Sequence, residues 1–384
     1  MDSPAQVSIT VQAGGVTALS THADLPTPLA ALTAIARQQN GVFTLAQARA
    51  CQVDEQVIAH LLRTRQWLPQ RRGVYVERAV FARCSEDPTL LQVLSVQAFL
   101  LAHRGDLVAS HTSAAALHRL PLLRSYGSKP VLTLHRPDAA PPARPGDRLA
   151  SSVPIAQRTR AFGLPVTNRP RTVADLARTL RWEAGVVMAD GALRAGVQRG
   201  EVQGLLNGPC HQWPGNNRAR AVLDFADPRA ESALESRARC WFAAMGLPAP
   251  ELQVQIFDEH RRFVARVDFL LEGRTICEVD GRLKYDDSSA LWAEKQREDR
   301  LRELGFEVVR GYWSDGADLT RLAGDLQRAF VRSALNPAPL RPLRCAALVR
   351  PLRCAALVRP LRCAAGRAGP VSATSLPVAT VSGP

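Results

Sequence analysis

The spacing of apolar and polar residues divides the stretch from Pro28 to Val76 into three short helices and a hairpin. Asn40-Gly41 ends the first apolar-periodic run, and Thr44 and Asp54 stand where the N-caps of two further helices belong. The predicted elements are helices over 28–39, 45–50 and 55–67 and strands over 42–43, 67–68 and 73–76. Three helices, a tight turn between the second and third, and a terminal hairpin predict a winged helix-turn-helix over 28–78.

A second patterned region runs from Pro228 to about residue 335. Gly246-Leu247-Pro248 ends its first helix, and the turn Glu272-Gly273-Arg274 joins two strand-like runs. The predicted elements are helices over 228–245 and 288–304 and strands over 252–257, 263–271, 275–279 and 306–312. This order predicts a mixed αβ core over 228–335, so the fold class is an α/β multidomain protein.

The segment between these regions is predicted to hold a middle α/β region over 79–205 and a linker over 206–227. Apolar runs indicate helices over 88–103 and 171–197, and VLTLHR reads as a strand. His111 and His118 lie seven residues apart, a spacing more typical of packed or capping residues than of a metal site.

The two ends of the chain lack such patterns. Residues 1–27 show no periodicity and are predicted to be a flexible leader. RPLRCAALV repeats at a nine-residue period from Arg341, and a short repeat with a proline in every copy cannot build a core, so 336–384 is predicted to be a disordered basic tail. The tail either adds nonspecific attraction to DNA or is a repeat expansion without function.

The formal net charge of +14 favours a polyanionic partner. Residues 337–384 hold seven arginines and no acid, which leaves about +7 for the rest of the chain. No apolar run approaches the roughly 20 residues of a membrane span, and the first 27 residues lack the pattern of a signal peptide. We therefore expect a cytoplasmic protein that does not bind membranes and whose cysteines are reduced thiols.

The basic residues of the winged-helix region suggest contacts with double-stranded DNA. Wing-tip and helix-end arginines suit phosphates, and polar residues earlier on the third helix suit base edges. The candidates are Arg63, Arg65, Arg71 and Arg72 for phosphates and Gln56 and His60 for bases. The alternative is a helical interaction module whose arginines form a solvated face.

The stretch from LAALTAIARQQNGVFTLAQARA to the ending RRGVYV resembles the N-terminal winged-helix domain of AbiEi-type antitoxins. SHTSAAALHRLP is similar to the region that follows this domain in AbiEi-like proteins. The resemblance implies DNA binding, often autoregulatory, in a toxin-antitoxin or bacterial defence setting, with a cognate toxin as a partner.

Three carboxylates in FVARVDFLLEGRTICEVDG fall where a divalent metal could use them. Asp268 lies on the first hairpin strand, and Glu278 and Asp280 lie two apart on the second, so these two project to the same side. Mg²⁺ takes oxygen ligands, and beside a phosphodiester it would polarise the scissile phosphate. Lys284 is a candidate for stabilising the transition state, and Glu235 is a candidate further ligand from the preceding helix.

ESALESRAR, RVDFLLEGRTICEVDGRLKY and EKQREDRLRELGFEVVRGYW together resemble endonuclease-like domains related to very-short-patch-repair nucleases, within the PD-(D/E)XK superfamily. The resemblance implies a restriction-endonuclease-like core and a Mg²⁺-dependent hydrolase site at Asp268, Glu278 and Asp280. Lys295 and Arg297, in AEKQRED, are candidates for holding the DNA backbone. The chain departs from the superfamily at Glu278-Val279-Asp280, because the nearest lysine is four positions later at Lys284.

Two interpretations of this acidic motif remain open. In the first, the protein is a Mg²⁺-dependent DNA endonuclease. In the second, the acids pair with arginines such as Arg266, Arg282 and Arg310, and the protein is a noncatalytic AbiEi-like antitoxin or transcriptional autoregulator with a degenerate nuclease fold.

Overall fold

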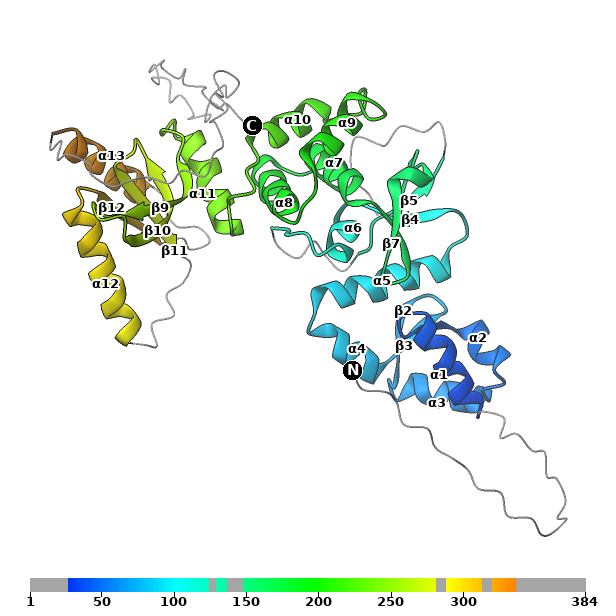
Figure 1. The fold of residues 1–384 in the computed structure, drawn as a ribbon. Helices are drawn as coiled ribbons and strands as arrows, with labels where there is room; N and C mark the ends of the chain where they lie inside the picture. The colour runs from blue at the N-terminus through cyan, green and yellow to red at the C-terminus, as the bar shows by residue number, and fades with distance from the viewer. Residues whose placement is uncertain (1–26, 124–128, 137–147, 281–287, 313–319, 336–384) are drawn as a thin grey trace, which may run out of the picture. The chain divides into compact units, whose positions relative to one another are not determined.

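The computed structural model describes residues 27–123, 129–136, 148–280, 288–312 and 320–335. The predicted basic tail, and the predicted leader up to residue 26, lie outside these residues. The described chain is a mixed α/β protein with three sheets, and it divides into two compact units with the boundary after Ser236 (Figure 1).

The N-terminal segment (residues 28–77) holds the three helices and the small sheet expected from the sequence. Its elements are α1 (Pro28–Gln38), β1 (Val42–Thr44), α2 (Leu45–Ala50), α3 (Glu55–Arg63), β2 (Trp67–Arg71) and β3 (Val74–Glu77). The sheet is antiparallel in the order β1-β3-β2. Thr44 and Asp54 cap α2 and α3 as predicted, because each side chain accepts a hydrogen bond from the first turn of its helix.

The third helix is shorter than predicted. It ends at Arg63 instead of reaching Trp67, because Arg65 takes a positive φ of 54° and Trp67 already belongs to β2. A left-handed residue breaks the helical hydrogen-bond ladder, so the chain turns from α3 into the hairpin within three residues.

Two helices, α4 (Arg78–Ser85) and α5 (Pro88–Ala102), follow the hairpin and lead to a five-stranded sheet in the order β6-β5-β4-β8-β7. The strands are β4 (Leu107–Ala109), β5 (Leu132–His135), β6 (Arg148–Ser151), β7 (Arg158–Ala161) and β8 (Leu164–Thr167), with the short helices α6 (His111–Leu117) and η1 (Ile155–Gln157) between them. Helix α5 packs on both sheets: Leu94 and Ala98 meet Val42 and Val76, while Val96 and Phe99 join the core of the larger sheet.

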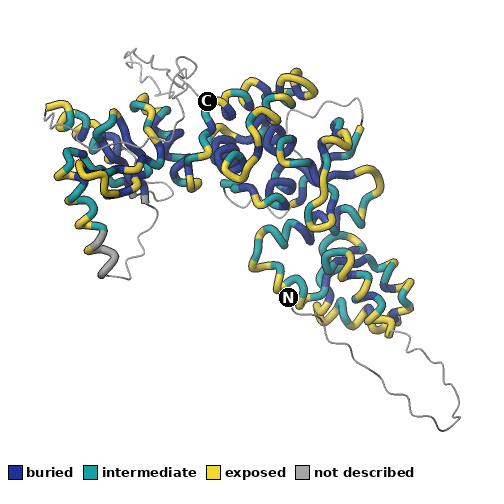
Figure 2. The backbone as a smooth tube through the Cα atoms, in the orientation of Figure 1, coloured by how far each residue is buried: buried dark blue, intermediate teal, exposed yellow. Residues whose placement is uncertain are grey.

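The helices that follow differ from the sequence-based prediction. One helix was expected over 171–197, but the chain forms α7 (Arg169–Thr179) and α8 (Trp182–Arg194), because Leu180 and Arg181 are extended. The segment 206–227, predicted to be a linker, contains α10 (Asn216–Phe225) after α9 (Arg199–Asn207). Val222 and Leu223 are fully buried, so α10 is a packed helix that belongs to the core and is not part of a linker (Figure 2).

The region from residue 233 to residue 335, most of which lies in the second unit, contains the helices and strands predicted up to residue 312 and one further helix, over 320–335, that was not predicted. These are α11 (Ala233–Ala244), β9 (Glu251–Phe257), β10 (Phe263–Leu271), β11 (Thr275–Asp280), α12 (Ser288–Glu303), β12 (Glu307–Tyr312) and α13 (Thr320–Leu335). The sheet order is β12-β11-β10-β9; the strands β9, β10 and β11 are antiparallel, and β12 joins β11 in parallel after α12. Val267, Ile276, Leu301 and Phe306 form the core between the sheet and α12.

Among the described residues, every helix is too short or too polar to cross a lipid bilayer.

Candidate functional site

The outward face of α3 carries polar side chains. Ile58 faces the core at 3% exposure, whereas Gln56, His60 and Arg63 are exposed. These three lie three or four residues apart and therefore share one face of the helix. Asp54 fixes the start of the helix by accepting hydrogen bonds from the backbone of Gln56 at 2.7 Å and of Val57 at 3.4 Å. The face is thus held on a capped helix.

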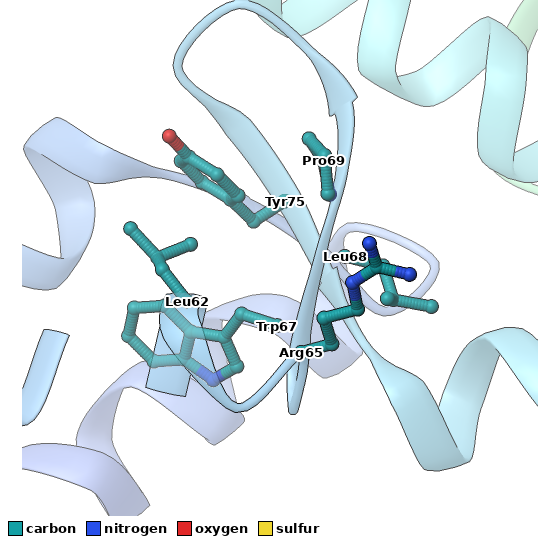
Figure 3. A pocket seen from close by; sticks show the side chains of 6 residues that line it. All are labelled: Leu62, Arg65, Trp67, Leu68, Pro69 and Tyr75. Atoms are coloured by element: carbon teal, nitrogen blue, oxygen red, sulfur yellow. The ribbon is translucent and has the colours of Figure 1, made fainter. Parts of the chain in front are cut away.

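An open pocket of about 530 Å³ lies between the end of α3 and the hairpin. Trp67 stands edge-on to Phe43 with 4.7 Å between ring centroids, and this contact fixes the hairpin against the helical core. Arg65 is exposed, and Arg78 holds its backbone carbonyl oxygen at 2.8 Å. The side chains around the pocket are those of Leu62, Arg65, Trp67, Leu68, Pro69 and Tyr75 (Figure 3).

The two arginines predicted at the wing tip differ in their surroundings. The guanidinium of Arg71 lies 4.2 Å from the ring centroid of Phe99 in α5, so this side chain fastens the hairpin to α5. Arg72 is exposed at the turn before Gly73. Three arginines are therefore exposed around the hairpin: Arg63 at the end of α3, Arg65 in the turn that follows, and Arg72 at the hairpin turn.

The acidic pair lies on two neighbouring strands of the second unit. Phe269 pairs with Cys277, so the next step of the antiparallel register brings Asp268 opposite Glu278 on the same face. Burial raises the pKa of the Cys277 thiol, and the charges of Asp268 and Glu278 raise it further.

Glu278 is held by arginines. Its carboxylate is 9% exposed, and it lies 3.1 Å from Arg297 and 3.5 Å from Arg310. Arg310 is the neighbour of Glu278 across the parallel pairing of β11 with β12, and it also contacts Glu294 at 2.7 Å and Glu298 at 3.1 Å. The ion pair between Arg310 and the acidic motif, which the second interpretation expected, is therefore present.

Asp268 has a polar neighbour that the sequence did not indicate. The side-chain amide of Gln253 in β9 donates a hydrogen bond to it at 3.3 Å. Gln253 has a positive φ of 52°, a rare backbone conformation for this residue type within a strand. This contact could not be found without knowing that β9 lies beside β10.

The predicted Mg²⁺ site is described only in part. The backbone of Asp280 ends β11, but its side chain and Lys284 lie outside the described residues. Among the described residues, no group of three or more His, Cys, Asp and Glu side chains is arranged so that it could hold a metal ion. Asp268 and Glu278 supply carboxylate oxygens, which are the type of ligand that Mg²⁺ prefers.

The remaining predicted residues lie near the two helices of the second region. At the start of α11, Glu235 is buried: it accepts a hydrogen bond from the backbone of Glu231 at 2.9 Å, and its own backbone donates to Ser232 at 3.1 Å. This arrangement resembles a capping box. On α12, Lys295 is exposed, whereas Arg297 pairs with Glu278.

Taken together, the elements define a mixed α/β protein with a polar and basic helix face in one unit and a pair of strand carboxylates in the other. The chain belongs to the same family as two Mycobacterium tuberculosis proteins, Uncharacterized protein Rv2248 of strain ATCC 25618 / H37Rv and Uncharacterized protein MT2308 of strain CDC 1551 / Oshkosh. It is 31% identical to each over 255 residues, which cover 64% of this chain and 90% of each relative. No family model matches the chain.

Proposed function

We propose that this protein binds duplex DNA and that residues 28–77 do so as a winged helix-turn-helix. The observation that carries the proposal is the capped α3, whose exposed face presents Gln56, His60 and Arg63 beside the hairpin. A helix of this kind fits the major groove, where amide and imidazole groups can contact base edges and arginines can contact phosphates. The resemblance to AbiEi-type antitoxins supports DNA binding and an autoregulatory role.

The charges around this face agree with such a partner. Arg63, Arg65 and Arg72 are exposed, while the nearby acid Glu55 is paired with Arg49 at 2.6 Å. Each phosphate contact releases condensed counterions, so binding should weaken as salt is raised.

The test is a fluorescence-anisotropy titration of labelled duplex at several salt concentrations. Replacing Arg63 and Arg72 together by alanine should weaken binding and lower the slope of log affinity against log salt by about 1.8, because two phosphate contacts are lost. The matched control replaces the exposed Arg104 and Arg160, which removes the same charge elsewhere. Equal weakening in both double variants would show that only net charge matters and would overturn the proposal.

A second candidate function is Mg²⁺-dependent hydrolysis of a phosphodiester in DNA. Its support is the placement of Asp268 and Glu278 on one face of adjacent strands, together with the PD-(D/E)XK resemblance. Asp268, Glu278 and Asp280 would hold the ion, which when bound would polarise the phosphate. Lys295, exposed on α12, would contact the DNA backbone, and Lys284 would stabilise developing negative charge.

Incubation of plasmid with the protein and Mg²⁺ tests cleavage. The wild type should nick or linearise the plasmid, and Asp268→Asn should abolish cleavage while DNA binding persists, because an amide oxygen is a poor substitute for a carboxylate ligand. Asp299→Asn, at an exposed position of α12, is the control and should cleave like the wild type. If all three proteins bind DNA and none cleaves it, the protein is the noncatalytic regulator of the alternative interpretation.

A further inference from the structure

Arg297 lies against the carboxylate that the cleavage proposal assigns to a metal. Its Nη2 atom is 3.1 Å from Oε1 and 3.3 Å from Oε2 of Glu278, so one guanidinium nitrogen reaches both oxygens. A charge-assisted contact of this kind occupies the lone pairs that a cation would use. A divalent ion at Glu278 must therefore compete with Arg297.

The two arginines at Glu278 are not equally fixed. Arg310 is 20% exposed and contacts Glu294 and Glu298 as well as Glu278, so it is held by three carboxylates. Arg297 is 34% exposed, and within the described residues its ion pair is with Glu278. Breaking the ion pair between Arg297 and Glu278 therefore costs less free energy than removing Arg310 from its three carboxylates.

We propose that Arg297 serves as an internal counter-ion for Glu278 in the absence of substrate and transfers to a DNA phosphate when duplex reaches the site. A guanidinium forms charge-assisted hydrogen bonds with phosphate oxygens as it does with carboxylate oxygens, so Arg297 would exchange one charged acceptor for another. The exchange removes one of the cations that compete with the metal ion for Glu278. DNA and metal then bind cooperatively, and each raises the affinity for the other by the same factor. This inference rests on the second proposed function.

Mn²⁺ binding, followed by the loss of the electron paramagnetic resonance signal of the free ion, tests the exchange without requiring cleavage. Arg297→Gln should bind Mn²⁺ about two- to fivefold more tightly than the wild type in the absence of DNA, the range that a partly exposed ion pair is worth. Arg300→Gln is the matched control, because Arg300 lies on the same helix and pairs with Glu303. It should leave the Mn²⁺ affinity unchanged, and Arg297→Lys, which retains the charge, should stay near the wild type.

The second arm adds a short duplex, with duplex alone as the blank. The duplex should raise the Mn²⁺ affinity of the wild type and have a much smaller effect on Arg297→Gln, in which residue 297 no longer competes with the ion for Glu278. Unfolding in urea shows whether each variant is folded. If the wild type binds Mn²⁺ and Arg297→Gln matches it in both arms, the role of Arg297 is wrong while the metal site stands. If none of the proteins binds Mn²⁺ with or without duplex, the metal site and this inference are both wrong.

Discussion

Asp175, inside the first unit, brings two buried arginines together. Its carboxylate oxygens lie 2.9 Å from Arg171 and 3.0 Å from Arg178, and both guanidiniums lie over the ring of Trp213 at 4.5 and 4.9 Å. Burial alone would raise the pKa of Asp175, but the positive charges beside it, that of Arg171 first and that of Arg178 as well, outweigh burial and lower the pKa. The cluster therefore fastens the segment before α10 to α7 through charges that must stay paired.

His111 lies beside this cluster and is itself buried. Burial lowers its pKa, and its imidazole contacts the hydroxyl of Ser110 at 3.1 Å. Burial likewise lowers the pKa of His118, which contacts the backbone carbonyl of Thr167 at 2.7 Å. The first unit thus holds two histidines that favour the neutral form.

These pKa shifts predict that the first unit loses stability in mild acid. Below the unfolded-state pKa of about 6.5, the unfolded chain binds protons that the folded chain resists, so the free energy of unfolding falls by up to about 1.4 kcal/mol per pH unit for each histidine. Asp175, whose folded pKa is also lowered, contributes a further loss below about pH 4. Urea unfolding between pH 7 and pH 5 measures the decrease in the free energy of unfolding that comes from the two histidines.

His111→Asn should flatten part of this dependence. Asparagine tolerates the positive φ of 49° at this position and does not titrate, so the variant tests protonation with little backbone strain. His118 should supply the slope that remains. An unfolding free energy that is constant from pH 7 to pH 5 in the wild type would contradict the prediction.

At the scale of elements, the N-terminus of α11 shows a predicted metal ligand in another role. Glu235 accepts from the backbone of Glu231, and its own backbone donates to Ser232, so both groups stabilise the first turn. The sequence pattern of serine followed three residues later by glutamate is itself typical of a capping box. The local pattern could have indicated this role, since it needs no tertiary information.

Glu235→Ala should therefore lower the free energy of unfolding by about 0.5–2 kcal/mol, the usual effect of losing a cap. If capping is its whole role, the variant should retain the Mn²⁺ affinity of the wild type. Thermal or urea unfolding measures the first quantity and paramagnetic resonance the second, with Asp299→Ala as the exposed control. Loss of Mn²⁺ binding in a folded Glu235→Ala variant would instead assign Glu235 to the metal.

The helices also show where local patterns are sufficient and where they fail. The caps Thr44 and Asp54 were predictable, because an N-cap bonds to the turn that directly follows it. The division between α7 and α8 was not, because apolar residues continue through Leu180 and only the extended backbone at Leu180 and Arg181 separates the helices. Burial on several sides removes the periodicity that would mark such a break.

At the scale of the whole molecule, the carboxylate pair shows the same limit. The alternation of a strand predicted that Glu278 and Asp280 share a face, and the hairpin turn brought Asp268 near them. The partners of Glu278 come from α12 and from β12, across a parallel pairing that follows a helical crossover. Such pairings join residues far apart in the chain, and no local spacing encodes them.

The sequence by itself determined the α/β class, the order of helices and strands over 28–77 and from α11 to β12, and the residue types available for contacting DNA or a cation. Those features depend on periodicity, capping and composition, which are properties of neighbouring residues. The tertiary structure alone decided that Arg71 packs on Phe99, that α10 belongs to the core, and that Glu278 is held between Arg297 and Arg310. The physical reason is that long-range packing and charge pairing select one partner among many of the same chemical type.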